Sequence, residues 1–128
     1  MINQIFSIRG ATTVGENSVE EITLRSVELM SEIVKRNGLN DNKDLEITDY
    51  LISTTDDITA FYPARAIRES KVVDAPIFSM KEPSIDGALK MCIRIMVRVA
   101  NSGERVEPKH VYMRGAQNLR RDIVDKQE

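Results

Sequence analysis

The sequence of 128 residues is poor in the residue types on which most metal, redox and stacking sites depend. It has one cysteine, Cys92, and one histidine, His110, so an intramolecular disulfide is excluded and we expect no zinc site. It has no tryptophan, and aromatic residues make up 5% of the chain, which is sparse for a protein that stacks nucleic-acid bases. No apolar run approaches the roughly 18 residues of a membrane-spanning helix.

Charge and the start of the chain exclude further classes. The first residues contain no basic run followed by an apolar one, so we expect no signal peptide and a cytoplasmic location. The net charge of −2 does not create the positive electrostatic field that attracts nucleic acid. We therefore expect neither nucleic acid nor a membrane as a partner. Eleven of the eighteen basic residues are arginines, whose planar fork matches carboxylates and phosphates. Composition leaves open whether these arginines bind an anion or lie on the surface.

Hydrophobic periodicity predicts one α/β (α+β) domain over residues 1–128, with the element order β-α-β-α-β-β-β and the helices on one face of a single sheet. Ser18 and Glu21 indicate a capping box, and Gly38 marks the end of that helix. We expect residues 9–13 to leave the first strand as a loop, and the tail from Gly115 to be mobile. Two helices leave apolar surface uncovered, which favours an oligomer. The predicted strands are 4–8, 47–54, 75–80, 92–99 and 110–113, and the second helix is 62–69.

The common catalytic templates are absent: there is no P-loop, no G-x-G-x-x-G and no G-x-S-x-G. We interpret His110 as a strand residue satisfied by hydrogen bonds and Cys92 as a buried, inert thiol. Residues of the predicted strand 92–99 alternate in hydrophobicity, which predicts Ile93 and Ile95 on one face and Arg94 on the other. An unpaired charge in the middle of such an apolar strand is costly. Arg94 therefore needs an internal carboxylate or an anionic ligand, unless it faces outward from an edge strand.

Ordered segments over about residues 5–120 resemble the AroH-type chorismate mutases. The match begins at Ile-Arg-Gly-Ala-Thr-Thr-Val (8–14) and continues in register through the segments 61–69, 79–82, 89–94 and 110–112. The resemblance implies the Claisen rearrangement of chorismate to prephenate, in phenylalanine and tyrosine biosynthesis, without metal, cofactor or covalent intermediate. It also implies a homotrimer of ferredoxin-like subunits that form a pseudo-α/β-barrel, with active sites between subunits.

The resemblance also implies the roles of three catalytic residues. Arg94 would stabilise the charge that gathers on the ether oxygen, and its isoleucine neighbours would reduce screening and hold its aim. Glu82 would accept a hydrogen bond from the ring hydroxyl, and Arg9 would bind a substrate carboxylate. The neighbouring subunit would contribute the second helix and its cap, and the tail would close over the substrate. The implied substrate-binding residues are Tyr112, Arg65, Arg68, Tyr62, Ala64, Ile77, Phe78, Ser79, Leu119 and Arg120, with Ser79 at a position where the family often has cysteine.

Other functions and simpler roles for these residues stay open at this point. A non-enzymatic sensor of a carboxylate metabolite would not require Glu82 and Arg94 together with Arg9. An imine deaminase on a related trimeric scaffold would share the architecture but not the matched segments. Arg65 could lie on a solvated helix face, and Arg120 could be plain tail charge. Arg68 could pair with a carboxylate such as Glu69.

Overall fold

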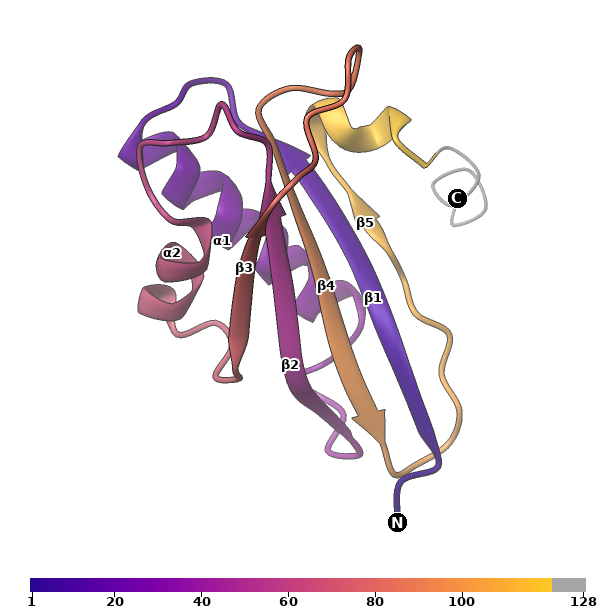
Figure 1. Cartoon of the computed structure of the whole chain (residues 1–128). Coiled ribbons are helices and arrows are strands. Elements are labelled where there is room, and N and C mark those ends of the chain that lie inside the picture. The colour runs from indigo at the N-terminus through magenta and orange to yellow at the C-terminus, as the bar shows by residue number, and fades with distance from the viewer. Residues whose placement is uncertain (121–128) are drawn as a thin grey trace.

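Two ten-residue strands, β4 (Cys92–Asn101) and β1 (Gln4–Thr13), form the antiparallel centre of a five-stranded sheet (Figure 1). The computed structural model describes residues 1–120. Alternate residues of β4 from Ile93 to Val99 are at most 3% exposed, whereas the residues between them are exposed. The alternation predicted from the sequence is therefore confirmed, because successive side chains of a strand point to opposite faces.

Three further strands complete the sheet. β2 (Leu45–Thr54) pairs with the free side of β4 in antiparallel fashion, with an irregularity between Ile47 and Asp49. β3 (Ile77–Lys81) runs parallel to β2, and the short β5 (Val111–Tyr112) runs parallel to β1. The order β3-β2-β4-β1-β5 makes the sheet mixed and leaves β3 and β5 at its two edges.

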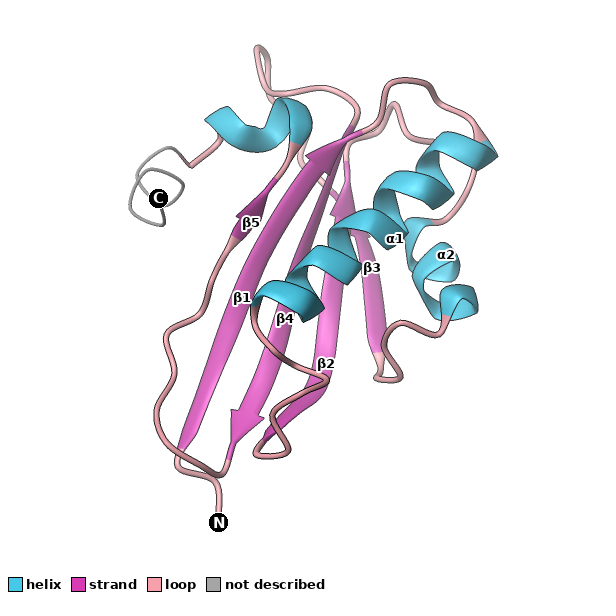
Figure 2. Ribbon diagram, turned by 180° about the vertical axis from the view of Figure 1, so that it is seen from behind, coloured by secondary structure: helices cyan, strands magenta, loops and turns pink. Residues whose placement is uncertain are grey.

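Both helices connect parallel strands, and this explains why they share a face. α1 (Val19–Arg36) links β1 to β2, with β4 inserted between them, and α2 (Pro63–Ser70) links β2 to β3. Both crossovers step in the same direction along the sheet, so right-handed connections place both helices on the same side. Figure 2 shows the two helices side by side over that face. The predicted mixed α+β sheet with helices on one face is confirmed, and its core lies beneath α1 with Ile22, Leu29, Met30 and Ile33 fully buried.

Only one of the two hydrogen bonds of the predicted capping box is present at the start of α1. The Ser18 hydroxyl accepts a hydrogen bond from the Glu21 backbone N–H at 3.2 Å. The Glu21 side chain accepts from the Gly15 N–H at 3.1 Å rather than from the N–H of Ser18, so it fixes the preceding loop instead of closing a capping box. At the start of α2, Pro63 occupies the first turn, as the sequence indicated.

The expected loop at residues 9–13 is wrong, because β1 continues through Thr13. Arg9 to Thr13 pair with the first half of β4, and Gly10 lies where α1 crosses the strand. A Cβ on Gly10 would lie 2.6 Å from Ile33 Cδ1, so the glycine serves close helix packing rather than a turn. The glycine that suggested a loop is the residue that this contact requires.

The tail also begins differently from the prediction. Instead of an irregular segment from Gly115, a 3-10 helix, η1 (Arg114–Asn118), follows β5. Ala116 is fully buried, and the Gly115 N–H donates to Thr13 Oγ1 at 3.0 Å, which fixes the segment against the end of β1. The rest of the predicted mobile tail, residues 121–128, lies outside the described residues. Neither helix within residues 1–120 is long and apolar enough to cross a lipid bilayer.

The face of the sheet opposite the helices, called the open face here, is covered by η1 at one end and by no other helix of residues 1–120 (Figure 1). Large apolar side chains lie on it: Ile5 is 66% exposed, Phe78 65%, Met80 43% and Met96 40%. Large apolar side chains exposed on one face of a sheet favour an interaction site on that face. The expectation of uncovered apolar surface is therefore confirmed.

Candidate active site

Arg94 lies on the open face in the middle of the sheet. Its Cα partners are Ala11 on β1 and Ser53 on β2, so it belongs to a central strand and not to an edge. The flanking Ile93 and Ile95 are buried on the opposite, helix-covered face. The expectation that these isoleucines shield Arg94 is therefore wrong, because neighbours in a strand point away from each other. The Arg94 side chain is 44% exposed within one chain.

Glu82 supplies the carboxylate that the position of Arg94 required. Arg94 Nε lies 3.3 Å from Glu82 Oε1, and the Ser53 hydroxyl donates a short hydrogen bond to the same oxygen. Glu82 follows β3 directly, and its N–H donates to the Thr54 carbonyl at 2.8 Å, which extends the β2–β3 pairing by one step. The internal carboxylate is thus found, and it leaves the guanidinium accessible from the open face.

Arg9 and Tyr112 lie on the same end of the open face as Arg94. Tyr112 pairs with Ala11, which itself pairs with Arg94, so one row crosses β4, β1 and β5. Arg9 lies two residues from Ala11 on β1, so it is a diagonal cross-strand neighbour of Arg94. Residues in this relation are about 7–8 Å apart. The Arg9 backbone N–H donates to His110 Nδ1 at 2.9 Å, which confirms His110 as a hydrogen-bonded residue of this segment. Two arginines and a phenol therefore face one region.

The tail residues reach the same region. Leu119 packs with Tyr112 against the small cluster of Ala11, Cys92 and Ala116. Burial lowers the pKa of His110, and the positive charges of Arg9 and Arg120 lower it further. Arg120 follows Leu119 directly in the chain, which places it at this end of the sheet. Of the predicted residues, Arg94, Glu82, Arg9, Tyr112, Leu119 and Arg120 are thereby brought together.

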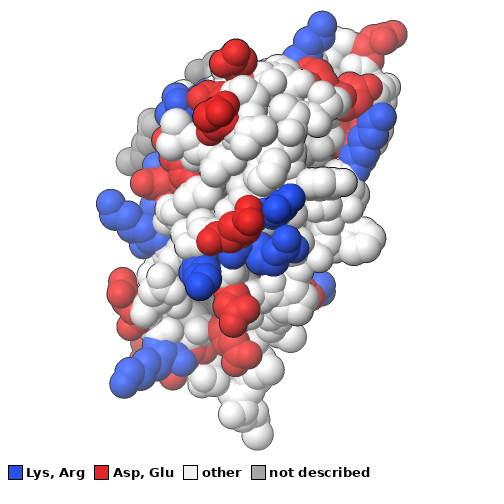
Figure 3. Space-filling model, turned by 90° about the vertical axis from the view of Figure 1, so that its left-hand side faces the viewer, with Lys and Arg blue, Asp and Glu red and all other residues white. Residues whose placement is uncertain are grey.

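The residues predicted on α2 lie elsewhere, along the β3 edge. Tyr62, the residue before α2, is 69% exposed, and the Arg65 guanidinium lies 5.5 Å from the Phe61 ring. Arg65 also pairs with Glu69 across 3.5 Å, although both side chains are more than half exposed and such a pair contributes little. Figure 3 looks onto this side of the molecule, where basic side chains gather in the middle of the surface.

Of the two other predicted residues of α2, Ala64 is buried and Arg68 is exposed. Ala64 is 7% exposed and belongs to the main core, so it could offer a ligand its backbone more readily than its methyl group. Arg68 lies close enough to act on Tyr50, whose pKa burial raises to about 12 against the lowering effect of that guanidinium.

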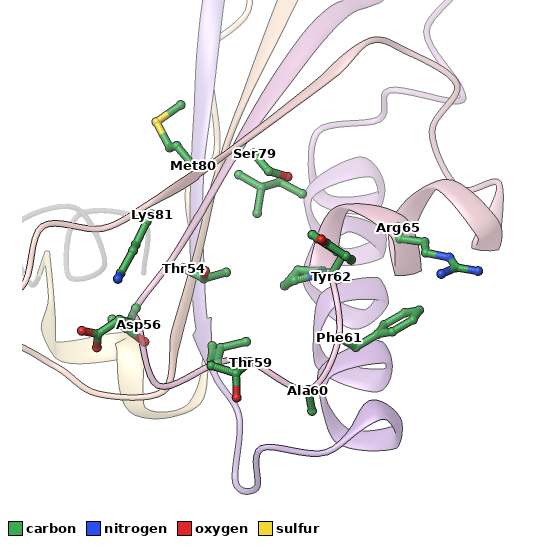
Figure 4. A pocket seen from close by; sticks show the side chains of 14 residues that line it. Thr54, Asp56, Thr59, Ala60, Phe61, Tyr62, Arg65, Ser79, Met80 and Lys81 are labelled. Carbon is green, nitrogen blue, oxygen red and sulfur yellow. The ribbon is translucent and has the colours of Figure 1, made fainter.

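A cleft of about 560 Å³ lies at this edge, between β2, the loop before α2, and β3 (Figure 4). Tyr62, Arg65 and Ser79 line it together with Met80 and Lys81. β3 divides its predicted residues between two faces, because Phe78 is exposed on the open face whereas Ile77 packs against the main core. Lys81 was not predicted as a site residue; its cleft position follows from the pairing of β3 with β2.

The Cys92 thiol and possible metal ligands are the remaining groups that could carry chemistry. Cys92 is fully buried, and burial raises the pKa of its thiol against the lowering effect of Arg94, so the prediction of a buried thiol is confirmed. No cluster of three or more histidine, cysteine, aspartate or glutamate side chains within residues 1–120 is arranged to hold a metal ion.

The arrangement of arginines, one glutamate and one tyrosine at the end of a mixed sheet can be compared with known proteins. The family model described as chorismate mutase type I matches residues 5–123. The chain belongs to the chorismate mutase type I family. It is accordingly an isomerase that converts chorismate to prephenate, which favours the enzyme over a carboxylate sensor or an imine deaminase.

Individual relatives agree over nearly the whole chain. The chorismate mutase AroH of Bacillus subtilis is 36% identical over 120 residues, which cover 93% of this chain and 92% of the relative. The chorismate mutase AroH of Thermus thermophilus is 31% identical over 120 residues, or 94% of this chain and 97% of the relative. Among solved structures, a chorismate mutase from Clostridium thermocellum matches with a TM-score of 0.77 and 35% identity, covering 88% of this chain and 97% of that chain.

Proposed function

We propose that the chain rearranges chorismate to prephenate, for phenylalanine and tyrosine synthesis, in clefts between the subunits of a cytoplasmic homotrimer. One observation carries the proposal: the predicted site residues form two groups at opposite sides of one sheet. The group around Arg94 lies on the open face, from Glu82 after β3 to Tyr112 on β5, whereas the group around Arg65 lies beside α2 along the β3 edge. Two such half-sites form one complete site when the β3 edge of one copy lies beside the open face of the next.

The open face supports this assembly. Its apolar residues, among them Phe78 and Met96, are exposed in the isolated chain and would be buried between copies, as in obligate interfaces. A closed ring of three sheets would also bring Arg94 out of solvent. Its electrostatic effect would increase there, because charges interact more strongly where water is excluded.

Arg94 would supply most of the rate enhancement. The rearrangement breaks an ether C–O bond while a C–C bond forms, and negative charge gathers on the ether oxygen. A guanidinium fixed beside that oxygen lowers the energy of the transition state more than that of the substrate. Glu82 holds the guanidinium from one side and would accept a hydrogen bond from the ring hydroxyl, which orients the ring.

The other residues would bind and fold the substrate. Chorismate is a dianion that must adopt a compact conformation before it reacts, so fixing its carboxylates reduces the entropic part of the barrier. Arg9 and Tyr112 are placed to bind one carboxylate, with Leu119 and Arg120 of the tail above them. The neighbouring subunit would add Tyr62, Arg65 and Arg68, and the backbone of its buried Ala64. Its β3 would add Ile77, Phe78 and Ser79. The proposed reaction is intramolecular and needs no cofactor.

Mixing of inactive chains tests the shared site. An Arg65→Ala/Arg68→Ala chain keeps its half-site on the open face, whereas an Arg94→Ala chain keeps its half-site at the β3 edge. After unfolding and refolding an equal mixture, about one quarter of the sites would combine two intact halves if three copies associate at random. Chorismate loss by ultraviolet absorbance should recover to about that fraction. Mixed trimers that remain as inactive as the parents would contradict the proposal, as would full activity in a monomer.

A further inference from the structure

Ser53 contacts the proposed catalytic carboxylate, although no sequence motif points to it. It lies on the open face of β2, where its Cα partners are Arg94 on β4 and Met80 on β3. Its side chain is partly buried, and its hydroxyl donates to Glu82 Oε1. Arg94 Nε faces the same oxygen at 3.3 Å, so a hydroxyl and a guanidinium share one carboxylate oxygen.

Glu82 needs such a partner to hold one conformation. Its backbone is fixed by the bond to the Thr54 carbonyl, but its side chain has three rotatable bonds and leaves the end of an edge strand. Restricting a glutamate side chain costs conformational entropy, which a charge-assisted hydrogen bond offsets. Because both contacts are made by Oε1, Oε2 is the oxygen left to accept the ring hydroxyl.

The hydroxyl also limits the attraction between the two charged groups. A guanidinium beside an unshared carboxylate forms a closer, bidentate pair, and this would turn its donors away from the substrate. A hydroxyl that donates to Oε1 occupies one of its lone pairs and disperses its charge. Arg94 is then held by Glu82 without being fully neutralised by it.

We propose that Ser53 is a positioning residue for the rearrangement: its hydroxyl fixes the Glu82 carboxylate and, through it, the direction of the Arg94 guanidinium. This inference rests on the proposed function, in which Glu82 and Arg94 touch the substrate. Ser53 itself acts only through Glu82.

Steady-state kinetics of the full chain test this role with three variants. Ser53→Ala removes the hydroxyl and should lower kcat about tenfold, the effect of losing about 1.4 kcal/mol of transition-state stabilisation, with a smaller change in KM. Ser53→Thr keeps a hydroxyl in a residue suited to strands and should restore kcat to within about threefold of the parent. Ser7→Ala makes the same chemical change on the same face, opposite Arg98, and should leave kcat unchanged.

A double-mutant cycle separates positioning from general support of the sheet. In a Glu82→Ala background Ser53 has no carboxylate to hold, so adding Ser53→Ala should change kcat by less than about twofold. An equal tenfold loss in both backgrounds would overturn the proposal, as would a Ser53→Thr variant as slow as Ser53→Ala. Thermal unfolding of each variant checks that the protein is folded at the assay temperature.

The outcomes also distinguish this inference from the proposed function. If Ser53→Ala matches the parent while Glu82→Ala and Arg94→Ala lose activity, Ser53 has no positioning role and the proposed site stands. If Glu82→Ala and Arg94→Ala both keep full activity, the proposed site itself is wrong, and the role of Ser53 falls with it.

Discussion

A group of hydrogen bonds around Asp57 fixes the chain just before β4, the strand that carries Arg94. Replacing Asp57 should therefore lower the stability of the protein by an amount that can be worked out from these bonds. Both Asp57 oxygens accept from the Met91 backbone N–H, at 3.1 and 3.0 Å, and Oδ1 also accepts from the Thr55 hydroxyl at 2.5 Å. Thr55 Oγ1 in turn accepts from the Cys92 N–H at 2.9 Å. Met91 has a φ of 53°, a left-handed conformation that costs a non-glycine residue about 1–2 kcal/mol. The carboxylate thus holds a strained residue at the start of β4.

Asp57→Ala should lower the free energy of unfolding by about 2 kcal/mol, because hydrogen bonds to a charged acceptor contribute about 1.5–3 kcal/mol and the strain at Met91 loses its compensation. For a chain of this length that corresponds to a fall in Tm of about 6–10 °C. Asp56→Ala is the matched control, since Asp56 is exposed and should matter by less than about 0.5 kcal/mol. Equal Tm values for Asp57→Ala and the parent would refute the reasoning.

The effect should also depend on pH. Burial raises the pKa of Asp57, but the hydrogen bonds from Thr55 and the Met91 amide outweigh burial, so the pKa in the folded protein lies below its usual value. A depressed pKa means that the carboxylate adds stability above its unfolded pKa of about 3.9 and loses this contribution as the pH falls through the folded value. The difference between the parent and Asp57→Ala should therefore shrink below about pH 4. Urea unfolding at several pH values measures it, and a difference that stays constant down to pH 3 would contradict the assignment.

The remaining predictions concern the active site and the assembly. Arg94→Lys keeps the positive charge but loses the planar guanidinium with its several donors, and kcat should fall by about 10²–10³. Near-normal turnover would refute the role of Arg94. Arg9→Ala should mainly raise KM, and an unchanged KM would count against carboxylate binding by Arg9. Met96→Lys places a charge in the centre of the open face and should dissociate the proposed trimer, as measured by light scattering. Leu24→Lys, a 52% exposed control on α1, should leave the assembly intact, and an unchanged mass for Met96→Lys would exclude the open face from the interface.

Local sequence signals predicted the parts of the fold that local physics determines. The strict alternation of β4 placed Arg94 opposite the buried isoleucines, and Ser18 marked the start of α1. The order of strands and helices was also correct, since periodicity distinguishes a ten-residue strand from an eighteen-residue helix. These signals were enough for the fold class, and the matched segments were enough for the family.

Features that depend on distant contacts were not predicted. Gly10 was taken as part of a loop, because nothing near it in sequence reveals that Ile33 packs on it. The shielding of Arg94 was assigned to its neighbours in sequence, although these point to the other face. Ser53 was missed because its partner Glu82 is 29 residues away and is brought to it by the parallel register of β2 and β3. Tertiary pairing, and not residue type, creates each of these contacts.

The most direct test of the account is a crystal structure of the protein with a bicyclic mimic of the transition state. We expect the Arg94 guanidinium to lie within hydrogen-bond distance, about 3 Å, of the bridging oxygen of the mimic, with Arg65 of a neighbouring subunit in the same cleft. A guanidinium that points into bulk water, or a mimic bound by residues of a single chain, would contradict the central claim.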